Sequence, residues 1–282
     1  MSKAFDRNLG LLTEEEQLIL ASKTVAIAGL GGVGGSHLLT LVRMGVQNFH
    51  IADMDHFELV NMNRQAGATM STLGQEKTKV MEKMALDINP DCKITVFSTG
   101  VTDDNLDTFL DDVDVFIDGF DAFVLDIRAK TFEACRAKGI PAITAGPIGL
   151  SAAYLVFDPK GMSFEDYFQF KGKSDLQKSI HLIVGVAPSL TQKDHIIDYR
   201  YVDFKNKKGP SLVPSCMACS AVVGSEVLKL LLNRGKIHYA PWAMQFDMYK
   251  NRYHKIYNWY GNRNPINKIK IKIVSSKVIR KN

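Results

Sequence analysis

Short apolar runs alternate with segments of helical periodicity through the first half of the chain. The apolar runs predict five strands, at Thr24–Ala28, 49–52, Lys93–Phe97, 113–117 and 141–145. Apolar residues recur every three or four positions at 14–21, 37–44, 75–88 and 124–138, which predicts four helices. Buried strands that alternate with helices are typical of a doubly wound α/β fold, with a mostly parallel sheet and helices on both faces.

The second half of the chain has a different pattern. Ser151–Phe157 is apolar but no helix follows it, so we expect an antiparallel extension of the sheet there. A helix is predicted at 221–232, and a hairpin of two strands at 242–249 and 253–259. Residues 266–274 alternate Ile with Lys, which indicates an edge strand with one wet face.

Two segments of the second half, 159–180 and 191–215, are polar and rich in Lys, Gly and Pro. We expect them to be mobile loops over a site. No Pro/Gly/Ser-rich linker divides the chain cleanly into two domains.

Composition narrows the class of protein only a little. The 282 residues are 46% hydrophobic and 23% charged, which is ordinary for a globular chain with a large core. The net charge of +5 suits anionic ligands such as nucleotides and would tolerate RNA. We see no apolar run of about 18 residues and no signal pattern before Glu14, so we expect a cytoplasmic protein without a membrane segment. The four cysteines are too scattered for a disulfide framework.

A glycine-rich turn follows the first predicted strand and precedes a helix. It contains Gly29, Gly31, Gly32 and Gly34. Glycine allows a tight turn and close approach of the backbone to a phosphate, and the helix N-terminus beyond it offers free N–H groups. Asp53 ends the next strand, where a carboxylate can accept hydrogen bonds from a ribose. This pattern predicts a Rossmann-like nucleotide site, which an NAD(P)-dependent oxidoreductase would share.

The residues after this acid favour ATP cleavage over hydride transfer. The polar residues are Asp55, Asn61, Asn63, Arg64, Gln65 and Lys77. Arg and Lys can hold phosphates and neutralise charge as pyrophosphate leaves. Asp121 follows the fourth predicted strand, where one carboxylate with water could carry Mg²⁺.

These motifs, in this order and spacing, resemble the ThiF/MoeB/HesA group, which is related to the ubiquitin-activating enzymes. The resemblance covers about residues 7–157, and 221–232 looks like a later helix of the family. It implies one ThiF-type adenylation domain over 1–282. Residues 1–157 would bind the nucleotide, and 158–282 would hold the substrate and the dimer contacts and end in a basic tail.

The resemblance also implies a homodimer that binds Mg-ATP and adenylates a C-terminal carboxylate with release of pyrophosphate. Gly32 would lie under the nucleotide and Asp53 would hold the ribose. Asn61, Arg64 and Lys77 would hold the phosphates, and Asp121 the metal. Arg7 resembles an N-terminal arginine that reaches the ATP of the partner subunit, although its flanking residues depart from the family pattern.

Structural interpretations compete at several of these positions. Asp55 could cap a turn, and Asn61 and Asn63 could be turn formers. Arg64 could pair with Asp55 on the surface, and Lys77 could be an ordinary exposed helix residue. Asp118, at the end of the fourth strand, is expected to be structural.

The cysteines depart from the zinc pattern of many relatives. Cys216 and Cys219 form one Cys-x-x-Cys pair where those relatives have two, so we do not expect zinc. The pair precedes the helix predicted at 221–232, and a helix N-terminus favours the thiolate. Either thiol could accept an acyl group as a thioester, and the alternative is that both are buried as small apolar residues.

The leading hypothesis is an adenylyltransferase that activates the C-terminus of a ubiquitin-like or sulfur-carrier protein, or of a peptide. The missing zinc ligands and the basic tail also resemble tRNA threonylcarbamoyladenosine dehydratase, which adenylates a carboxylate on tRNA and cyclises it. An NAD(P)-dependent oxidoreductase and a non-catalytic partner subunit complete the alternatives.

Overall fold

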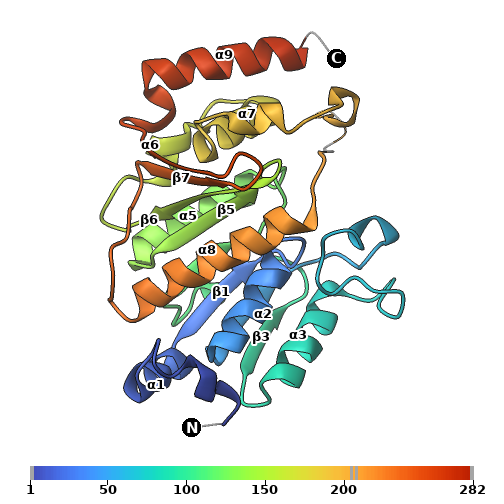
Figure 1. Ribbon diagram of the computed structural model, residues 1–282, viewed down its shortest axis with the longest axis vertical. Coiled ribbons are helices and arrows are strands. Elements are labelled where there is room, and N and C mark those ends of the chain that lie inside the picture. The colour runs from blue at the N-terminus through green and yellow to red at the C-terminus, as the bar shows by residue number, and fades with distance from the viewer. Residues whose placement is uncertain (1–2, 204–205, 207–208, 280–282) are drawn as a thin grey trace.

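The computed structural model describes residues 3–203, 206 and 209–279, and its centre is one eight-stranded sheet (Figure 1). The strands are β1 (Thr24–Ala28), β2 (Asn48–Ala52), β3 (Lys93–Phe97), β4 (Val115–Asp118), β5 (Ala142–Pro147), β6 (Ser151–Phe157), β7 (Trp242–Asp247) and β8 (Arg252–Tyr257). Their order across the sheet is β3-β2-β1-β4-β5-β6-β7-β8. The strands from β3 to β5 are parallel neighbours, and β6, β7 and β8 continue the sheet antiparallel. The predicted fold class is confirmed.

Helices cover both faces of this sheet. They are α1 (Glu14–Ser22), α2 (Gly34–Met44), α3 (Lys77–Ile88), α4 (Leu106–Phe109), α5 (Asp126–Lys138), α6 (Phe164–Phe168), α7 (Asp175–Val186), α8 (Val213–Leu231) and α9 (Pro265–Ile279). Short 3₁₀ turns are η1 (Lys3–Asn8), η2 (Leu59–Asn61), η3 (Thr191–Asp194), η4 (Tyr199–Tyr201) and η5 (Gly261–Arg263). Buried apolar side chains form two clusters, one on each face of the sheet. The first core cluster joins α2, α3 and α8 to one face, and the second core cluster joins α5, α6 and α7 to the other.

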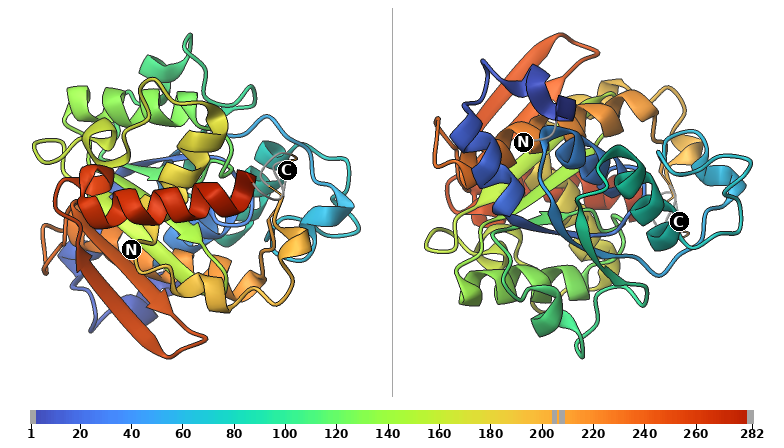
Figure 2. Two further views of the ribbon diagram at one scale, coloured as in Figure 1. Left: turned by 90° about the horizontal axis from the view of Figure 1, so that it is seen from above. Right: turned by 90° about the horizontal axis from the view of Figure 1, so that it is seen from below.

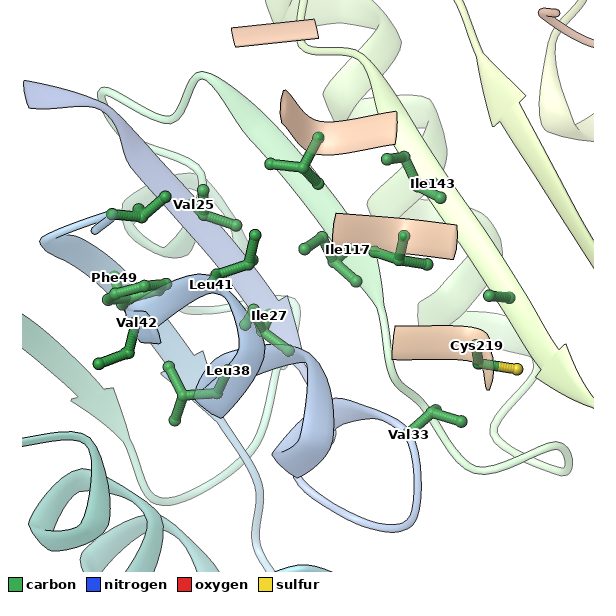
Figure 3. Packing of buried hydrophobic residues seen from close by; sticks show 14 of the residues in the cluster. Val25, Ile27, Val33, Leu38, Leu41, Val42, Phe49, Ile117, Ile143 and Cys219 are labelled. Carbon is green, nitrogen blue, oxygen red and sulfur yellow. The ribbon is translucent and has the colours of Figure 1, made fainter. Parts of the chain in front are cut away.

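The first core cluster shows why the periodicity of the sequence was informative. Leu38 and Leu41 of α2 pack on Val25 and Ile27 of β1, and all four are fully buried (Figure 3). Each such side chain contributes about 1.5–3 kcal/mol by leaving water. Cys219 of α8 lies in the same apolar layer.

Helix α8 begins at Val213, eight residues before the predicted start. Pro214 in its first turn suits a helix start, because the missing N–H has no partner there in any helix. By length and composition α8 is long and apolar enough to cross a membrane, so the expectation that no run reaches that length is wrong. Its residues Val223 and Val227 are instead fully buried against the sheet, as in a core helix.

The C-terminal prediction of an edge strand at 266–274 is wrong, because this segment lies in α9. Asn264 accepts a hydrogen bond from the Ile266 N–H, and Pro265 occupies the first helical position. The less exposed of the described side chains recur at helical spacing, at Asn267, Lys270, Ile271, Val274, Ser275 and Val278, and α9 packs on α7. The Ile–Lys alternation was too short to distinguish the two periods.

The segment 159–180 is not the loop that its polarity predicted. Ser163 caps α6, and Ser174 forms a capping box with Gln177 at the start of α7. Phe164 and Phe168 are buried in the second core cluster. In the other segment, 191–215, the described residues form η3, η4 and the first turn of α8, and 204, 205, 207 and 208 lie outside the described residues.

Candidate nucleotide site

The glycine turn joins β1 to α2 at the carboxyl end of the parallel strands. Gly29 has φ +88°, a left-handed conformation that favours glycine, and its N–H donates to the Ala52 carbonyl at 2.7 Å. A Cβ on Gly34 would stand 1.7 Å from the Gly29 carbonyl oxygen, so only glycine fits there. The turn therefore leads directly into the N-terminus of α2, where unpaired N–H groups can receive an anion.

A chain of hydrogen bonds runs from this turn to Lys77. The Leu30 N–H donates to one oxygen of Asp53 at 2.6 Å, and the Asp55 N–H donates to the other at 2.8 Å. Lys77 Nζ then pairs with Asp55 Oδ2 at 2.9 Å. The Lys77 side chain is only 7% exposed, so it is not the ordinary exposed helix residue of the structural alternative. Asp55 is 64% exposed and pairs with Lys77, not with Arg64.

The segment 61–65 lies alongside the glycine turn. Carbons Cγ and Cδ of Arg64 stand 3.4 and 3.6 Å from where a Cβ on Gly32 would be, so the arginine crosses the turn. Gln65 lies against Gly31 in the same way, and its buried Oε1 has no hydrogen-bond partner within the described part of the chain. An orphaned buried acceptor beside a phosphate-type turn is suited to a ligand donor such as a hydroxyl.

The two asparagines have structural partners. Asn61 is buried and its Oδ1 accepts from the Glu58 N–H at 3.0 Å, which agrees with the turn-forming alternative. Asn63 accepts from Arg64 Nη1 at 2.9 Å and donates to the Ser211 carbonyl at 3.0 Å. Asn63 thus connects the arginine to the segment that precedes α8.

Asp121 lies in an exposed turn between β4 and α5. Its Oδ1 accepts from the Phe123 N–H at 3.0 Å. The turn is fixed by Arg128, whose guanidinium donates to the carbonyls of Phe120 at 2.7 Å, Asp121 at 3.0 Å and Val124 at 2.8 Å. Arg128 also pairs with Asp118 at 3.0 Å, and both side chains are buried. Asp118 is therefore structural, as expected.

The residue set is compatible with Mg²⁺ bound through a nucleotide. Within residues 3–203, 206 and 209–279, no three His, Cys, Asp or Glu side chains cluster as metal ligands. Mg²⁺ at phosphate sites usually takes only one or two carboxylates and completes its shell with water and phosphate oxygens. The exposed carboxylate of Asp121 fits that role, and the metal itself stays a prediction.

Cys216 lies beside the nucleotide turn, which the sequence did not predict. Its Sγ stands 3.1 Å from where a Cβ on Gly32 would be. Burial raises the pKa of the Cys216 thiol, and the Ser211 hydroxyl and the charge of Arg64 offset only part of that rise. Burial also raises the pKa of Cys219 well above its usual range. Both cysteines are fully buried in α8, which agrees with the alternative that they pack as small apolar residues, and the thioester stays a prediction.

Arg7 lies outside the site of its own chain. Its neighbour Asn8 donates to the Met44 carbonyl at 3.3 Å, at the far end of α2 from the glycine turn. The 11 residues of α2 span about 16 Å. Arg7 is exposed, so it is free to reach another copy, as the resemblance implies, and this stays a prediction.

Sequence reasoning missed Arg128 as a residue that shapes the site. The available signal was a basic residue in the helix that follows Asp118 and Asp121, close enough in sequence to neutralise one of them. Nothing in the sequence indicated that the early start of α8 would bring Cys216 to Gly32.

The comparisons define the class of protein. A family model described as "ThiF family" matches residues 5–264. The chain belongs to the ThiF family.

Relatives with curated names differ in what they act on. The tRNA threonylcarbamoyladenosine dehydratase of Bacillus subtilis is 35% identical over 111 residues, which are 39% of this chain and 44% of the relative. The adenylyltransferase and sulfurtransferase MOCS3 of Drosophila virilis is 24% identical over 235 residues, 73% of this chain and 50% of the relative. The chain thus spans about half the length of the curated relatives it matches.

A solved structure shows the same fold over most of the chain. The crystal structure of the E. coli tRNA threonylcarbamoyladenosine dehydratase, TcdA, has a TM-score of 0.59 at 22% identity, and the match covers 82% of this chain and 94% of that one. At this identity the likeness concerns the fold alone.

Proposed function

We propose that this protein uses ATP to adenylate a carboxylate, with a carboxylate carried on tRNA as the first substrate class to test. The observation that carries the proposal is the hydrogen-bonded chain from Leu30 through Asp53 and Asp55 to Lys77. It ties a buried lysine to the glycine turn, and Arg64 crosses the same turn. Two cations beside a phosphate turn are suited to a triphosphate and are not needed for hydride transfer.

In the proposed reaction a substrate carboxylate oxygen attacks the α-phosphorus of ATP. A new bond forms between that oxygen and phosphorus, the bond from the α-phosphorus to the bridging oxygen breaks, and pyrophosphate leaves. Lys77 and Arg64 would neutralise the charge of the leaving group, and Lys77 would exchange Asp55 for a phosphate oxygen. Asp121 would hold Mg²⁺, which when bound neutralises further phosphate charge.

The choice of tRNA over a protein carboxylate rests on the named relatives. Three tRNA threonylcarbamoyladenosine dehydratases match at 30–35% identity. MOCS3 and the ubiquitin-like modifier-activating enzyme 5 of Caenorhabditis elegans also match, so a small protein or peptide ending in a carboxylate is the second candidate. The ThiF-family match favours both over an NAD(P)-dependent oxidoreductase.

ATP–pyrophosphate exchange separates these substrates. Exchange should require Mg²⁺ and should appear on addition of tRNA bearing threonylcarbamoyladenosine, or on addition of a peptide ending in Gly-Gly if the second candidate holds. Asp121→Ala should lower exchange about 100-fold, as expected for a group that stabilises transition-state charge. Asp104→Ala, at another exposed acid, should leave it unchanged. ATP binding without exchange on any carboxylate would refute the proposal.

A further inference from the structure

The charge of the chain is divided unevenly along the sequence. The 50 residues from Asn233 onward hold 12 of the 35 Lys and Arg but only one of the 30 Asp and Glu. That one acid, Asp247, is fully buried and bonded to His195 at 3.1 Å. The sequence of this C-terminal part is therefore strongly basic, whereas the preceding 232 residues carry a net negative charge. Such asymmetry is typical of a surface that meets a polyanion.

The β7–β8 hairpin, within this basic part, gathers exposed aromatic rings. Of the exposed aromatic side chains in the described residues, all but Tyr199 and Tyr201 come from the hairpin and the turns beside it: Phe246, Tyr249, Tyr253, Tyr257, Trp259 and Tyr260. The hairpin projects at the edge of the molecule in both views of Figure 2. These rings are therefore presented on a projecting element.

The strand register places several of these rings on one face, which we call the hairpin face. The cross-strand pairs are Trp242 with Tyr257, Met244 with Lys255, and Phe246 with Tyr253, and alternate residues of a strand share a face. Along β8 this face reads Tyr253, Lys255, Tyr257. Met244 is buried in the first core cluster, whereas Tyr253 and Tyr257 are more than half exposed.

The cations on the hairpin face are close to the rings. Lys255 Nζ lies 4.7 Å from the centre of the Trp242 ring and donates to His238 Nε2 at 2.9 Å. Lys236 is exposed nearby, and Lys229 is already paired with Glu226 at 2.6 Å. Burial and the charges of Lys255, Lys236 and Lys229 lower the pKa of His238.

We infer that the hairpin face binds RNA, with bases stacked on Tyr253 and Tyr257 and the phosphate backbone held by Lys255 and Lys236. Aromatic rings alternating with lysine on a strand pair offer both contacts that single-stranded RNA uses. Tyrosine and lysine also occur on membrane-interface surfaces, so binding to lipid vesicles is one of the outcomes that the test below measures. The inference rests on the proposed function only in naming tRNA as the RNA; the face is distant from Lys77 and adds no catalytic group.

The test is the binding of the full chain to bulk tRNA, followed by fluorescence anisotropy at several salt concentrations. Tyr257→Leu should weaken binding about tenfold, and Tyr257→Phe, which keeps the ring, should bind within about twofold of wild type. Lys255→Ala should lower the slope of log affinity against log salt by about one, because one phosphate contact is lost. Lys83→Ala, at an exposed lysine of α3, should change neither.

Three results would overturn the inference. Tyr257→Leu could bind tRNA as tightly as wild type. Vesicles with anionic lipid could bind the chain through this face while tRNA does not. Tyr257→Leu could split a dimer in sedimentation velocity without changing tRNA affinity, which would make the face a contact between copies. Loss of tRNA binding with intact pyrophosphate exchange on a peptide would overturn the choice of tRNA but keep adenylation. Binding of tRNA without pyrophosphate exchange on any carboxylate would overturn adenylation but keep the RNA-binding face.

Discussion

Two ion pairs flank the glycine turn, and they differ in how far they are open to solvent. Asp118 and Arg128 are 1% and 4% exposed, and the guanidinium donates to the Asp118 carboxylate and to three backbone carbonyls. Asp55 and Lys77 are 64% and 7% exposed. In the first pair both charges are closed off from ligands, whereas in the second the carboxylate is open and the lysine is buried behind it.

The difference separates a pair that shapes the backbone from a pair that can change partners. Arg128 donates hydrogen bonds to three carbonyls of the turn that carries Asp121, and these bonds fix the position of that carboxylate. Lys77 is held by a single carboxylate, which water can solvate when the lysine turns to a phosphate. The sequence pattern indicated Asp55, Lys77 and Asp118 but not Arg128, so the contrast between the two pairs appears only in the exposure that the structure shows.

The largest expected effect is from Arg128→Leu. Removing the guanidinium leaves Asp118 buried without a counter-charge, which should lower the free energy of unfolding by about 3–5 kcal/mol. Urea unfolding followed by circular dichroism measures it. The surface variant Lys130→Leu, whose ion pair with Asp103 is exposed, should lose less than about 1 kcal/mol. Equal losses for the two would contradict the comparison.

Lys77→Met should instead act on catalysis. Methionine fills the buried space while Asp55 stays solvated, so the free energy of unfolding should fall by less than about 1 kcal/mol. Exchange of ATP with pyrophosphate should fall about 100-fold, because a charge that stabilises the leaving group is gone. A stability loss as large as that of Arg128→Leu, with normal exchange, would show that the open pair is also structural.

The free energy of unfolding should depend on pH through His37 of α2. Burial lowers the pKa of His37 from 6.5 to about 3, so the unfolded chain binds a proton between these values and the folded chain does not. Stability is then full above pH 6.5 and falls as the pH drops from 6.5 towards 3, by at most about 1.4 kcal/mol per pH unit. Urea midpoints of wild type and His37→Leu between pH 7 and 5 measure it; parallel curves would refute the role of His37.

The smallest effect is expected for Cys216→Ala. Because burial raises the pKa of its thiol, Cys216 is protonated at neutral pH and a poor acyl acceptor. Exchange should stay within about threefold of wild type, and no thioester should be trapped with a peptide substrate by non-reducing electrophoresis. A thioester that disappears in the alanine variant would restore the acyl-acceptor hypothesis.

The parallel part of the sheet was predictable because its strands are short and apolar throughout. Predicted and observed bounds coincide for β1 and β3, and also for the antiparallel β6. The glycine turn and Asp53 were predictable because their chemistry is local: a left-handed residue, a close backbone approach and a strand-ending acid. The roles assigned to Arg64, Lys77 and Asp121 depended on the family resemblance.

The remaining features depend on contacts between distant residues. The burial of Asn267 and Lys270 against their neighbours selects a helix for α9, which a run of five alternating residues cannot indicate. The bond from Asn63 to Ser211 joins residues 148 positions apart, and the contact of Cys216 with Gly32 joins residues still farther apart in the sequence. The buried partner of Asp118 could be guessed from charge, but its three carbonyl acceptors could not.

The crossing of three glycines has a consequence for how this chain can vary. A Cβ on Gly29 would stand 2.2 Å from the Gly119 carbonyl oxygen, and one on Gly119 would stand 2.6 Å from that of Gly29. A Cβ on Gly34 would also meet the Gly29 carbonyl oxygen. All three substitutions therefore strain the same backbone crossing, and the effects of their alanine variants on stability should not add. Once the backbone has moved to accept one methyl group, the close packing at this crossing is already lost, so a second alanine should lower the stability little further.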